Sequence, residues 1–226
     1  MMKVLLFDID GTLMLSGGAG LRAMNEAFCQ VYGVRDALLH MDLAGRTDTS
    51  IIKDALAACR LPFEQEKLQQ FKNLYYELIR RQIDQPSNGK RLMPGVTELL
   101  ENLSHRDQVF LGLLTGNWET SGRVKLDHFR LGHYFSFGAF SDDSEIRTEL
   151  LPFAVERFRQ LYNSKPRPHE VYVIGDTPAD IQCAKPHGAI SVAVATSKYN
   201  ADDLHKHHPD YIFNDLNDAN VLQVLG

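Results

Sequence analysis

Short apolar runs along the chain predict buried strands. Residues 3–7 form such a run, and Asp8 ends it. The run is too short for a helix and is typical of a parallel strand that is buried on both faces. Similar runs at residues 109–114, 171–174 and 190–195 alternate with segments of helical apolar spacing. This alternation predicts an α/β fold, a doubly wound, Rossmann-like parallel sheet that helices cover on both faces.

The other elements of this alternating part follow from the same patterns. The spacing predicts helices at residues 96–103, 119–131, 149–162, 179–185 and 201–205, short strands at 135–140 and 211–213, and a terminal helix. The helices fall between the predicted strands, as the crossover connections of a parallel sheet require.

A helical stretch interrupts this alternation near the N-terminus. The spacing predicts three helices there, near residues 21–31, 50–59 and 64–83. Asp48 or Thr49 is suited to cap the second of these helices. The third helix carries an apolar stripe, which we expect to be core rather than a binding surface: Leu68, Phe71, Leu74, Tyr75, Leu78 and Ile79.

Two segments are expected to separate the helical stretch from the rest of the chain. Residues 9–20 are rich in glycine, which predicts a turn and a flexible loop. The sequence Gln-Pro-Ser-Asn-Gly at 85–89 predicts a linker. We therefore expect a core of residues 1–15 and 90–226, with a small α-helical domain inserted at 16–89.

The composition limits the kinds of partner. The chain has 226 residues and a formal net charge of −5, so it has no general attraction for nucleic acid or anionic membranes. Bound phosphate must therefore meet local positive groups. The apolar stretch that begins at Val4 is too short for a signal peptide, and no run approaches the length of a membrane span. Scattered cysteines, Cys29, Cys59 and Cys183, are typical of buried thiols in a reducing compartment, so a cytoplasmic protein is expected.

Polar residues directly follow three of the predicted strands. They lie in the segments Asp8-Ile9-Asp10-Gly11-Thr12, Thr115-Gly116-Asn117 and Gly175-Asp176-Thr177-Pro178-Ala179-Asp180. Because ligands bind at the carboxyl ends of the strands in an open parallel sheet, these segments are expected to meet in one crevice. Clustered carboxylates repel each other unless a cation lies among them, and an all-oxygen site favours a hard ion such as Mg²⁺.

These residue types suit phosphoryl transfer. The carboxylate of Asp8 can act as a nucleophile and form an aspartyl-phosphate. Asp10, two residues later, can protonate the leaving alkoxide and then deprotonate a water molecule. Thr115 offers a hydroxyl group, while Gly116 and Asn117 offer backbone N–H groups at a helix N-terminus, where phosphate binds readily.

The segments DIDGTL, LLTGN and IGDTPADI together resemble the haloacid dehalogenase superfamily of phosphohydrolases. The resemblance implies that Asp8 is the nucleophile and a metal ligand, and that Asp10 is the general acid/base and binds the metal through its backbone carbonyl. It also implies that Asp176 is a metal ligand and that Asp180 acts through a water molecule or another ligand. By the same resemblance, the helical insertion is the family's small cap domain, which closes over the site.

The sequence departs from the family pattern at one position. The family usually has a lysine at the start of the helix before the last motif, and no lysine occurs there. Arg147 is the nearest basic residue, and Lys125 is the alternative. An arginine could hold both a phosphate and a carboxylate through its fork of donors.

Several functions compete within this resemblance. A metabolite phosphatase similar to phosphoglycolate phosphatases is favoured over a phosphomutase of the β-phosphoglucomutase kind, because those mutases carry a characteristic histidine that residues 16–28 lack. A haloacid dehalogenase is disfavoured because those relatives lack an acid at the position of Asp10. A binding protein on an inactive scaffold is disfavoured because Asp8, Asp10 and Asp176 are all present. We therefore predict a Mg²⁺-dependent phosphatase of small phosphorylated metabolites.

One loop of the insertion, Ala44-Gly45-Arg46-Thr47-Asp48, contains a single basic residue. In the proteins that this chain resembles, a glycine-containing cap loop at a similar place points into the closed site. Gly45 permits a tight backbone there. We expect Arg46 to bind an anionic or polar group on the leaving part of the substrate through charge-assisted hydrogen bonds. A solvated arginine beside a helix start is the alternative.

Overall fold

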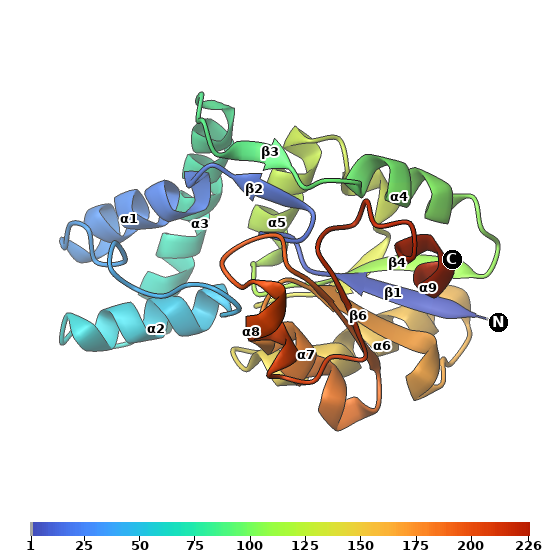
Figure 1. The fold of residues 1–226 in the computed structure, drawn as a ribbon. Coiled ribbons are helices and arrows are strands. Elements are labelled where there is room, and N and C mark those ends of the chain that lie inside the picture. Colours follow the sequence, from blue (N-terminus) through green and yellow to red (C-terminus); the bar gives the residue numbers. More distant parts are fainter. Residues whose placement is uncertain (1) are drawn as a thin grey trace.

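The computed structural model describes residues 2–226, and within them the core is a parallel sheet of six strands in the order β5-β4-β1-β6-β7-β8 (Figure 1). The strands are β1 (Lys3–Phe7), β4 (Val109–Leu114), β5 (Phe137–Ala139), β6 (Val171–Gly175), β7 (Ile190–Val194) and β8 (Tyr211–Phe213). This order confirms the predicted doubly wound α/β fold, because strand order reverses on either side of β1.

The two faces of β1 explain why residues 4–7 of the strand are all apolar. Leu5 and Phe7 point into one hydrophobic cluster, which includes side chains of the helix α4 (Val96–Ser104). Val4 and Leu6 point into a second cluster, beneath the helix α6 (Leu150–Tyr162). All four of these strand residues are fully buried. A strand covered on both faces has no solvent side, so no polar alternation appears in its sequence.

The helices of the core lie close to their predicted positions. Besides α4 and α6 they are α5 (Glu119–His128), α7 (Pro178–Ala184), α8 (Ala201–His205) and α9 (Val221–Leu225). The prediction for α5 was three residues too long, since Arg130 adopts a left-handed backbone with φ 58° that a helix cannot continue through. In residues 2–226, no helix combines the length and the apolar character that a membrane crossing needs.

Three helices form the insertion, as predicted: α1 (Ala19–Tyr32), α2 (Asp48–Ala58) and α3 (Gln65–Asp84). They lie to one side of the sheet (Figure 1). The predicted cap of α2 was wrong. The capping residue is Thr47, whose hydroxyl accepts from the Ser50 N–H at 3.2 Å. Asp48 is the first helical residue, and its carboxylate contacts the core instead.

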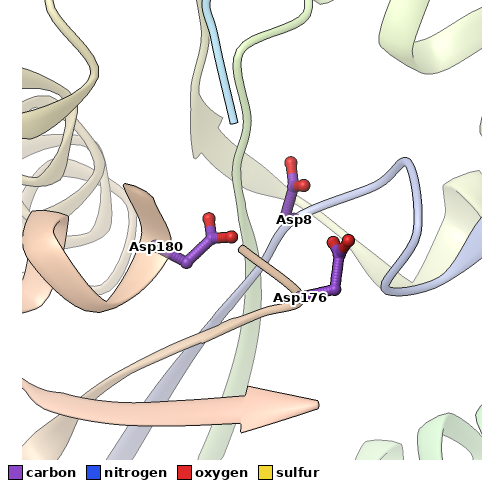
Figure 2. A group of neighbouring side chains, drawn as sticks. All are labelled: Asp8, Asp176 and Asp180. Atoms are coloured by element: carbon purple, nitrogen blue, oxygen red, sulfur yellow. The ribbon is translucent and has the colours of Figure 1, made fainter. Parts of the chain in front are cut away.

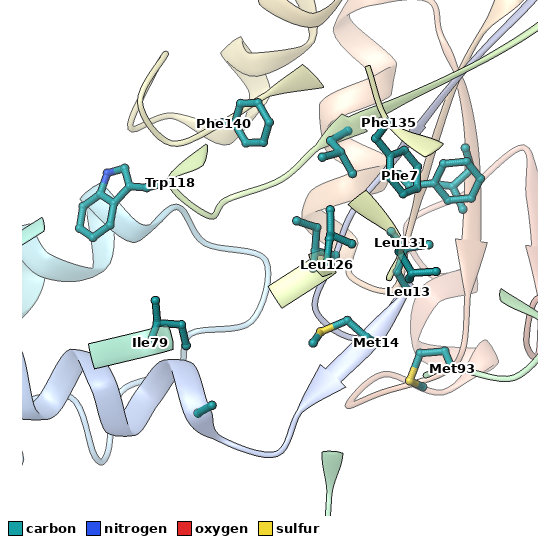
Figure 3. Close-up of a cluster of buried hydrophobic side chains, with 14 of the residues drawn as sticks. Phe7, Leu13, Met14, Ile79, Met93, Trp118, Leu126, Leu131, Phe135 and Phe140 are labelled. Atoms are coloured by element: carbon teal, nitrogen blue, oxygen red, sulfur yellow. The ribbon is translucent and has the colours of Figure 1, made fainter. Parts of the chain in front are cut away.

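The insertion and the core share one hydrophobic cluster. Ile79 of α3 and Trp118, next to α5, belong to the same group of buried side chains as Phe7 of the sheet (Figure 3). The Trp118 ring packs edge-on against Phe71 and Tyr75 of α3, with centroid distances of 6.0 and 5.8 Å. Burial of this kind of aromatic surface stabilises the closed arrangement of cap and core.

A short ribbon joins the two parts where a flexible loop was predicted. Strand β2 (Met14–Ser16) pairs antiparallel with β3 (Lys90–Leu92), and the two run side by side between the sheet and the helices (Figure 1). The loop prediction failed here because Met14 is fully buried and because residues 90–92, distant in sequence, supply the ribbon's hydrogen bonds. The proposed domain boundary at 15/16 falls within β2, and the one at 89/90 falls directly before β3. Both remain a prediction.

Candidate active site

The predicted site residues meet at the carboxyl end of the sheet. Strands β4, β1 and β6 are neighbours, so Thr115, Asp8 and Asp176 emerge side by side. A cavity of about 300 Å³ lies between this edge and the cap. Both the core residues and cap residues such as Gly45 and Tyr75 line it. The cavity has the size of a pocket for a small molecule.

Three buried carboxylates gather at one end of the cavity. Asp8, Asp176 and Asp180 each place an oxygen atom within 4.8 Å of the others (Figure 2). Asp176 is held from both sides, because Thr12 Oγ1 donates to its Oδ1 at 2.9 Å and Ser197 donates to its Oδ2. The site therefore has the oxygen-only chemistry that Mg²⁺ prefers.

The local sequence explains the position of Asp180. Thr177 is the N-cap of α7 and Asp180 is the third residue of the helix, so the two form a capping box. The Asp180 Oδ2 accepts from the Thr177 N–H at 3.1 Å and from its hydroxyl at 2.7 Å. Asp180 Oδ1 accepts from Arg147. Asp180 thus fixes the start of α7 and the Arg147 guanidinium next to the other two carboxylates.

The carboxylates hold protons unusually strongly in the absence of a cation. Burial raises the pKa of Asp176 to about 8, and the neighbouring charges of Asp8 and Asp180 add to this rise. Burial also raises the pKa of Asp8 to about 6, against the lowering effect of Arg147. A bound divalent cation would oppose both shifts, since it stabilises the charged carboxylates. The residues therefore fit the metal that the sequence implies.

Arg147, and not Lys125, lies against Asp8. Its Nη2 is 3.2 Å from Asp8 Oδ1 and also pairs with Asp180. The side chain is 8% exposed. Burial by itself would lower the pKa of Arg147, but the charges of Asp180 and Asp8 outweigh it and raise the pKa. Arg147 Nε has no hydrogen-bond partner among residues 2–226, although it is fully buried. A positive side chain that lines the cavity suits an anionic ligand.

Lys125 instead belongs to a second group around Asp10. Lys125 Nζ and Asn117 Nδ2 donate to Asp10 Oδ2, at 2.6 and 2.9 Å. Lys125 also donates to Asn117 Oδ1 at 2.6 Å, and Asn117 Nδ2 lies 2.8 Å from Thr115 Oγ1. The Asn117 N–H, which the sequence suggested for phosphate, donates to Thr115 Oγ1 at 3.3 Å. The Asp10 carboxylate is therefore fixed in orientation next to Asp8.

The cap loop presses its backbone, not the Arg46 side chain, against the core. A Cβ atom on Gly116 would lie 1.9 Å from the Arg46 carbonyl oxygen. A Cβ atom on Gly45, which has φ 70°, would lie 2.9 Å from Thr177 Oγ1. Glycine is therefore required on both sides of this contact. The Arg46 guanidinium turns back to its own helix, where Nη2 donates to Ser50 O at 3.2 Å and to Asp54 at 2.5 Å. Its proposed contact with a substrate remains a prediction.

Two cap residues at the cavity were missed in the sequence. Asp48 is 6% exposed, and its Oδ2 accepts from the Trp118 N–H at 2.9 Å and from Ser121 Oγ at 3.4 Å. Burial raises the pKa of Asp48 to about 7, although the charge of Lys125 opposes this. Tyr75 lines the cavity as well. Helical spacing correctly predicts that the Tyr75 ring lies in the core. Spacing does not predict that the Tyr75 side chain also reaches the cavity.

Residues 5–194 match the family model described as haloacid dehalogenase-like hydrolase. No curated protein matches the chain in sequence. Among solved structures, a predicted phosphoglycolate phosphatase from Haemophilus somnus 129pt is similar with a TM-score of 0.70 and 21% identity, over 100% of this chain and 98% of the other.

The CbbY protein from Rhodobacter sphaeroides was solved in complex with phosphate. It is similar with a TM-score of 0.76 and 18% identity, over 100% of this chain and 99% of the other. A D10N mutant of the same protein, in complex with xylulose-(1,5)bisphosphate, gives a TM-score of 0.78 and 16% identity, over 100% of this chain and 99% of the other. At these identities the likeness concerns the fold.

Proposed function

Since this chain belongs to the haloacid dehalogenase-like hydrolases, we propose that it is a Mg²⁺-dependent phosphatase of small phosphorylated metabolites, with Asp8 as its nucleophile. One observation carries the proposal. The Asp8 carboxylate is buried at the end of β1, between Arg147 and the other two acids of the cluster, and the fixed carboxylate of Asp10 lies next to it. A carboxylate that can act as the nucleophile, a positive group and a carboxylate that can act as the acid/base all line one cavity, which supports the proposal.

In the first step, an Asp8 oxygen attacks phosphorus and the bond from phosphorus to the substrate oxygen breaks. Asp10 gives its proton to the departing alkoxide. Asp10 then takes a proton from a water molecule, which attacks the aspartyl-phosphate and releases inorganic phosphate. Asn117 and Lys125 keep the Asp10 carboxylate in the orientation that both proton transfers need.

The phosphoryl group has suitable donors within the site. The Thr115 hydroxyl, the Gly116 N–H and Arg147 Nη1, which lies beside Gly116, can bind its oxygen atoms. Asp8, Asp176 and the backbone carbonyl of Asp10 would hold Mg²⁺, which offsets the negative charge of the phosphoryl group during attack. The carboxyl group of Asp10 favours this reaction over dehalogenation, which needs no proton donor at that position.

Two further points support a phosphatase. The similar CbbY structures were solved with phosphate and with a sugar bisphosphate, which agrees with a phosphorylated substrate here. The phosphomutase alternative has less support, because residues 16–28 contain no histidine. Gly20 lies in that segment. A side chain at this position would contact Lys125, because a Cβ atom on Gly20 would lie 3.5 Å from Lys125 Nζ.

The test is Mg²⁺-dependent release of phosphate from p-nitrophenyl phosphate, with EDTA as the metal-free control. Asp8→Asn should abolish turnover, because an amide is a poor nucleophile and a weaker magnesium ligand. The folded state of this variant is checked by its thermal melting curve. If Asp8→Asn keeps more than a few per cent of the parent kcat, or if EDTA has no effect, the proposed function is wrong.

A further inference from the structure

Beyond Asp10, the cavity continues into a polar pocket between core and cap, which we call the leaving-group pocket (Asp48, Tyr75 and Lys125). Its first unusual feature is the Tyr75 hydroxyl. Tyr75 is fully buried, and its Oη has no hydrogen-bond partner among residues 2–226. The ring stacks on Phe71 at 6.2 Å and meets Trp118 edge-on. With the ring held in this way, the hydroxyl ends beside Gly20, which also lines the cavity, and near the Ser121 side chain.

A buried hydroxyl without a partner is costly, since it loses its bonds to water and gains none in return. Native proteins leave few such groups, and those at cavities commonly complete their hydrogen bonds with a ligand or an ordered water molecule. Tyr75 is therefore set up to donate to, and accept from, a molecule inside the closed cavity.

Asp48 supplies a second polar group to the same pocket. Its Oδ2 is occupied by the Trp118 N–H and by Ser121. In the described part of the chain no group donates to its Oδ1, and Asp48 lines the cavity. The backbone N–H of Asp48 also donates to the Gly116 carbonyl at 2.7 Å. This hydrogen bond fixes Asp48 next to the Thr115-Gly116-Asn117 segment. A free carboxylate oxygen in this position accepts hydrogen bonds from hydroxyl groups and repels anions.

The cations that line the cavity are already engaged with acidic side chains. Each of those in the described residues already has an acidic partner: Lys125 with Asp10, Arg46 with Asp54, Arg147 with Asp8 and Asp180, and Lys198 with Asp42. A second phosphate or a carboxylate on the leaving part of a substrate would thus meet Asp48 without a cation of its own. Such a group is expensive to bury unpaired.

We propose that Asp48 and Tyr75 bind hydroxyl groups of an uncharged leaving alcohol, so that the preferred substrates are sugar or polyol monophosphates and not phosphorylated acids or bisphosphates. This inference rests on the proposed phosphatase function. Apolar side chains complete the pocket and can pack against the carbon atoms of such an alcohol: Leu21, Met24, Leu43 and Ile51. The cavity of about 300 Å³ limits the alcohol to a small one.

The test compares kcat/KM for three substrates in Mg²⁺ at about pH 8, where Asp48, with a pKa of about 7, is mostly charged. Sorbitol 6-phosphate has an uncharged polyol as its leaving group, phosphoglycolate has an anionic one, and p-nitrophenyl phosphate has no aliphatic hydroxyl and serves as the reference. The parent protein should prefer sorbitol 6-phosphate to phosphoglycolate by about tenfold or more. A preference for phosphoglycolate would overturn the inference.

Tyr75→Phe removes only the hydroxyl and keeps the ring packed. It should lower the ratio of kcat/KM for sorbitol 6-phosphate to that for p-nitrophenyl phosphate by about three- to tenfold, the scale of one hydrogen bond. Tyr76→Phe is the matched control, because Tyr76 lies on the same helix and does not line the cavity. That control should leave the ratio unchanged. Equal ratios in the Tyr75→Phe variant and the parent would overturn the role of Tyr75.

Asp48→Asn removes the negative charge at nearly the same volume. It should raise kcat/KM for phosphoglycolate relative to sorbitol 6-phosphate, because the repulsion of the anionic leaving group is lost. An unchanged or lowered relative value would overturn the role of Asp48. Absence of p-nitrophenyl phosphate hydrolysis by the parent protein is a different result. It would refute the phosphatase function itself, and the substrate inference would fall with it.

Discussion

Removal of the Arg147 side chain should weaken both the fold and the reaction. Arg147 is 8% exposed, while its partners Asp8 and Asp180 are 7% and 2% exposed at their side chains. These values place the contact among buried ion pairs, where loss of one partner leaves uncompensated charge and costs about 3–5 kcal/mol. For a chain of this size, each kcal/mol corresponds to about 2–4 °C in Tm. Arg147→Ala should therefore lower Tm by about 6–20 °C.

The assay is thermal unfolding in EDTA, followed by steady-state kinetics in Mg²⁺. Arg147→Ala should lower kcat by about 10²–10³, the scale for loss of one preorganised donor to the transition state. Arg147→Lys should retain part of the activity, since it keeps the charge but not the fork of donors. Arg159→Ala is the control, because Arg159 pairs with Glu156 at the surface and is 53% exposed. Its Tm should stay close to that of the parent.

The reasoning is refuted if Arg147→Ala melts within about 2 °C of the parent and has near-normal kinetics. If Lys125→Ala is inactive at the same time, the positive group that serves the phosphoryl transfer is Lys125 and not Arg147. The contacts of Lys125 with Asp10 and Asn117 predict a different effect, a change in proton transfer rather than in phosphate binding.

Three further predictions concern the proton, the metal and the cap. Asp10→Asn should slow esters with poor leaving groups far more than aryl esters, since general acid catalysis is worth about 10²–10⁴ where protonation is needed; equal losses in kcat for both classes would count against this role. The folded-state pKa values of Asp8 and Asp176, about 6 and about 8, exceed the ordinary value of 3.8, so without a cation these groups make the fold less stable as pH rises from about 4 to about 8. Mg²⁺ binds the deprotonated forms, so the rise in Tm that it causes should be larger at pH 8 than at pH 5; equal rises at both pH values would contradict this. If Arg46 leaves Asp54 to bind the substrate, Arg46→Ala should lower kcat/KM by about tenfold or more for the best carboxylated or sugar phosphate but not for p-nitrophenyl phosphate. A uniform effect or none would leave Arg46 as a surface residue or a structural residue of the cap.

The sequence predicts well those features that local patterns determine. The run before Asp8 had to be a strand buried on both faces, because it is too short for a helix and has no polar alternation. The motif residues Asp8 and Asp176 then had to meet, because parallel strands end at the same edge of a sheet. Arg147, which the sequence suggested as the positive group, contacts Asp8 from the short turn before α6, and its role stays a prediction.

The features that were missed depend on contacts between distant parts of the chain. Strands β2 and β3 have three residues each, so neither shows a periodicity, and only their pairing makes them strands. The roles of Asp48 and Tyr75 depend on how the cap sits on the core. Helical spacing correctly predicted that the Tyr75 ring is buried, but the end of the ring that reaches the cavity is fixed by Phe71 and Trp118.

The ribbon of β2 and β3 connects the cap to the core through two adjacent strands, so the cap is an insertion that could be exchanged. Ser16 pairs with Lys90 at the far end of the ribbon, so the chain leaves the core and returns to it at nearly one point. A tight turn could join these two residues and convert the ribbon into a β-hairpin. Such a chain would keep Asp8, Asp10 and Asp176 and lose Asp48 and Tyr75. Chemistry and substrate choice would thus be carried by separate stretches of the sequence, and new specificities could be obtained by exchanging the cap alone.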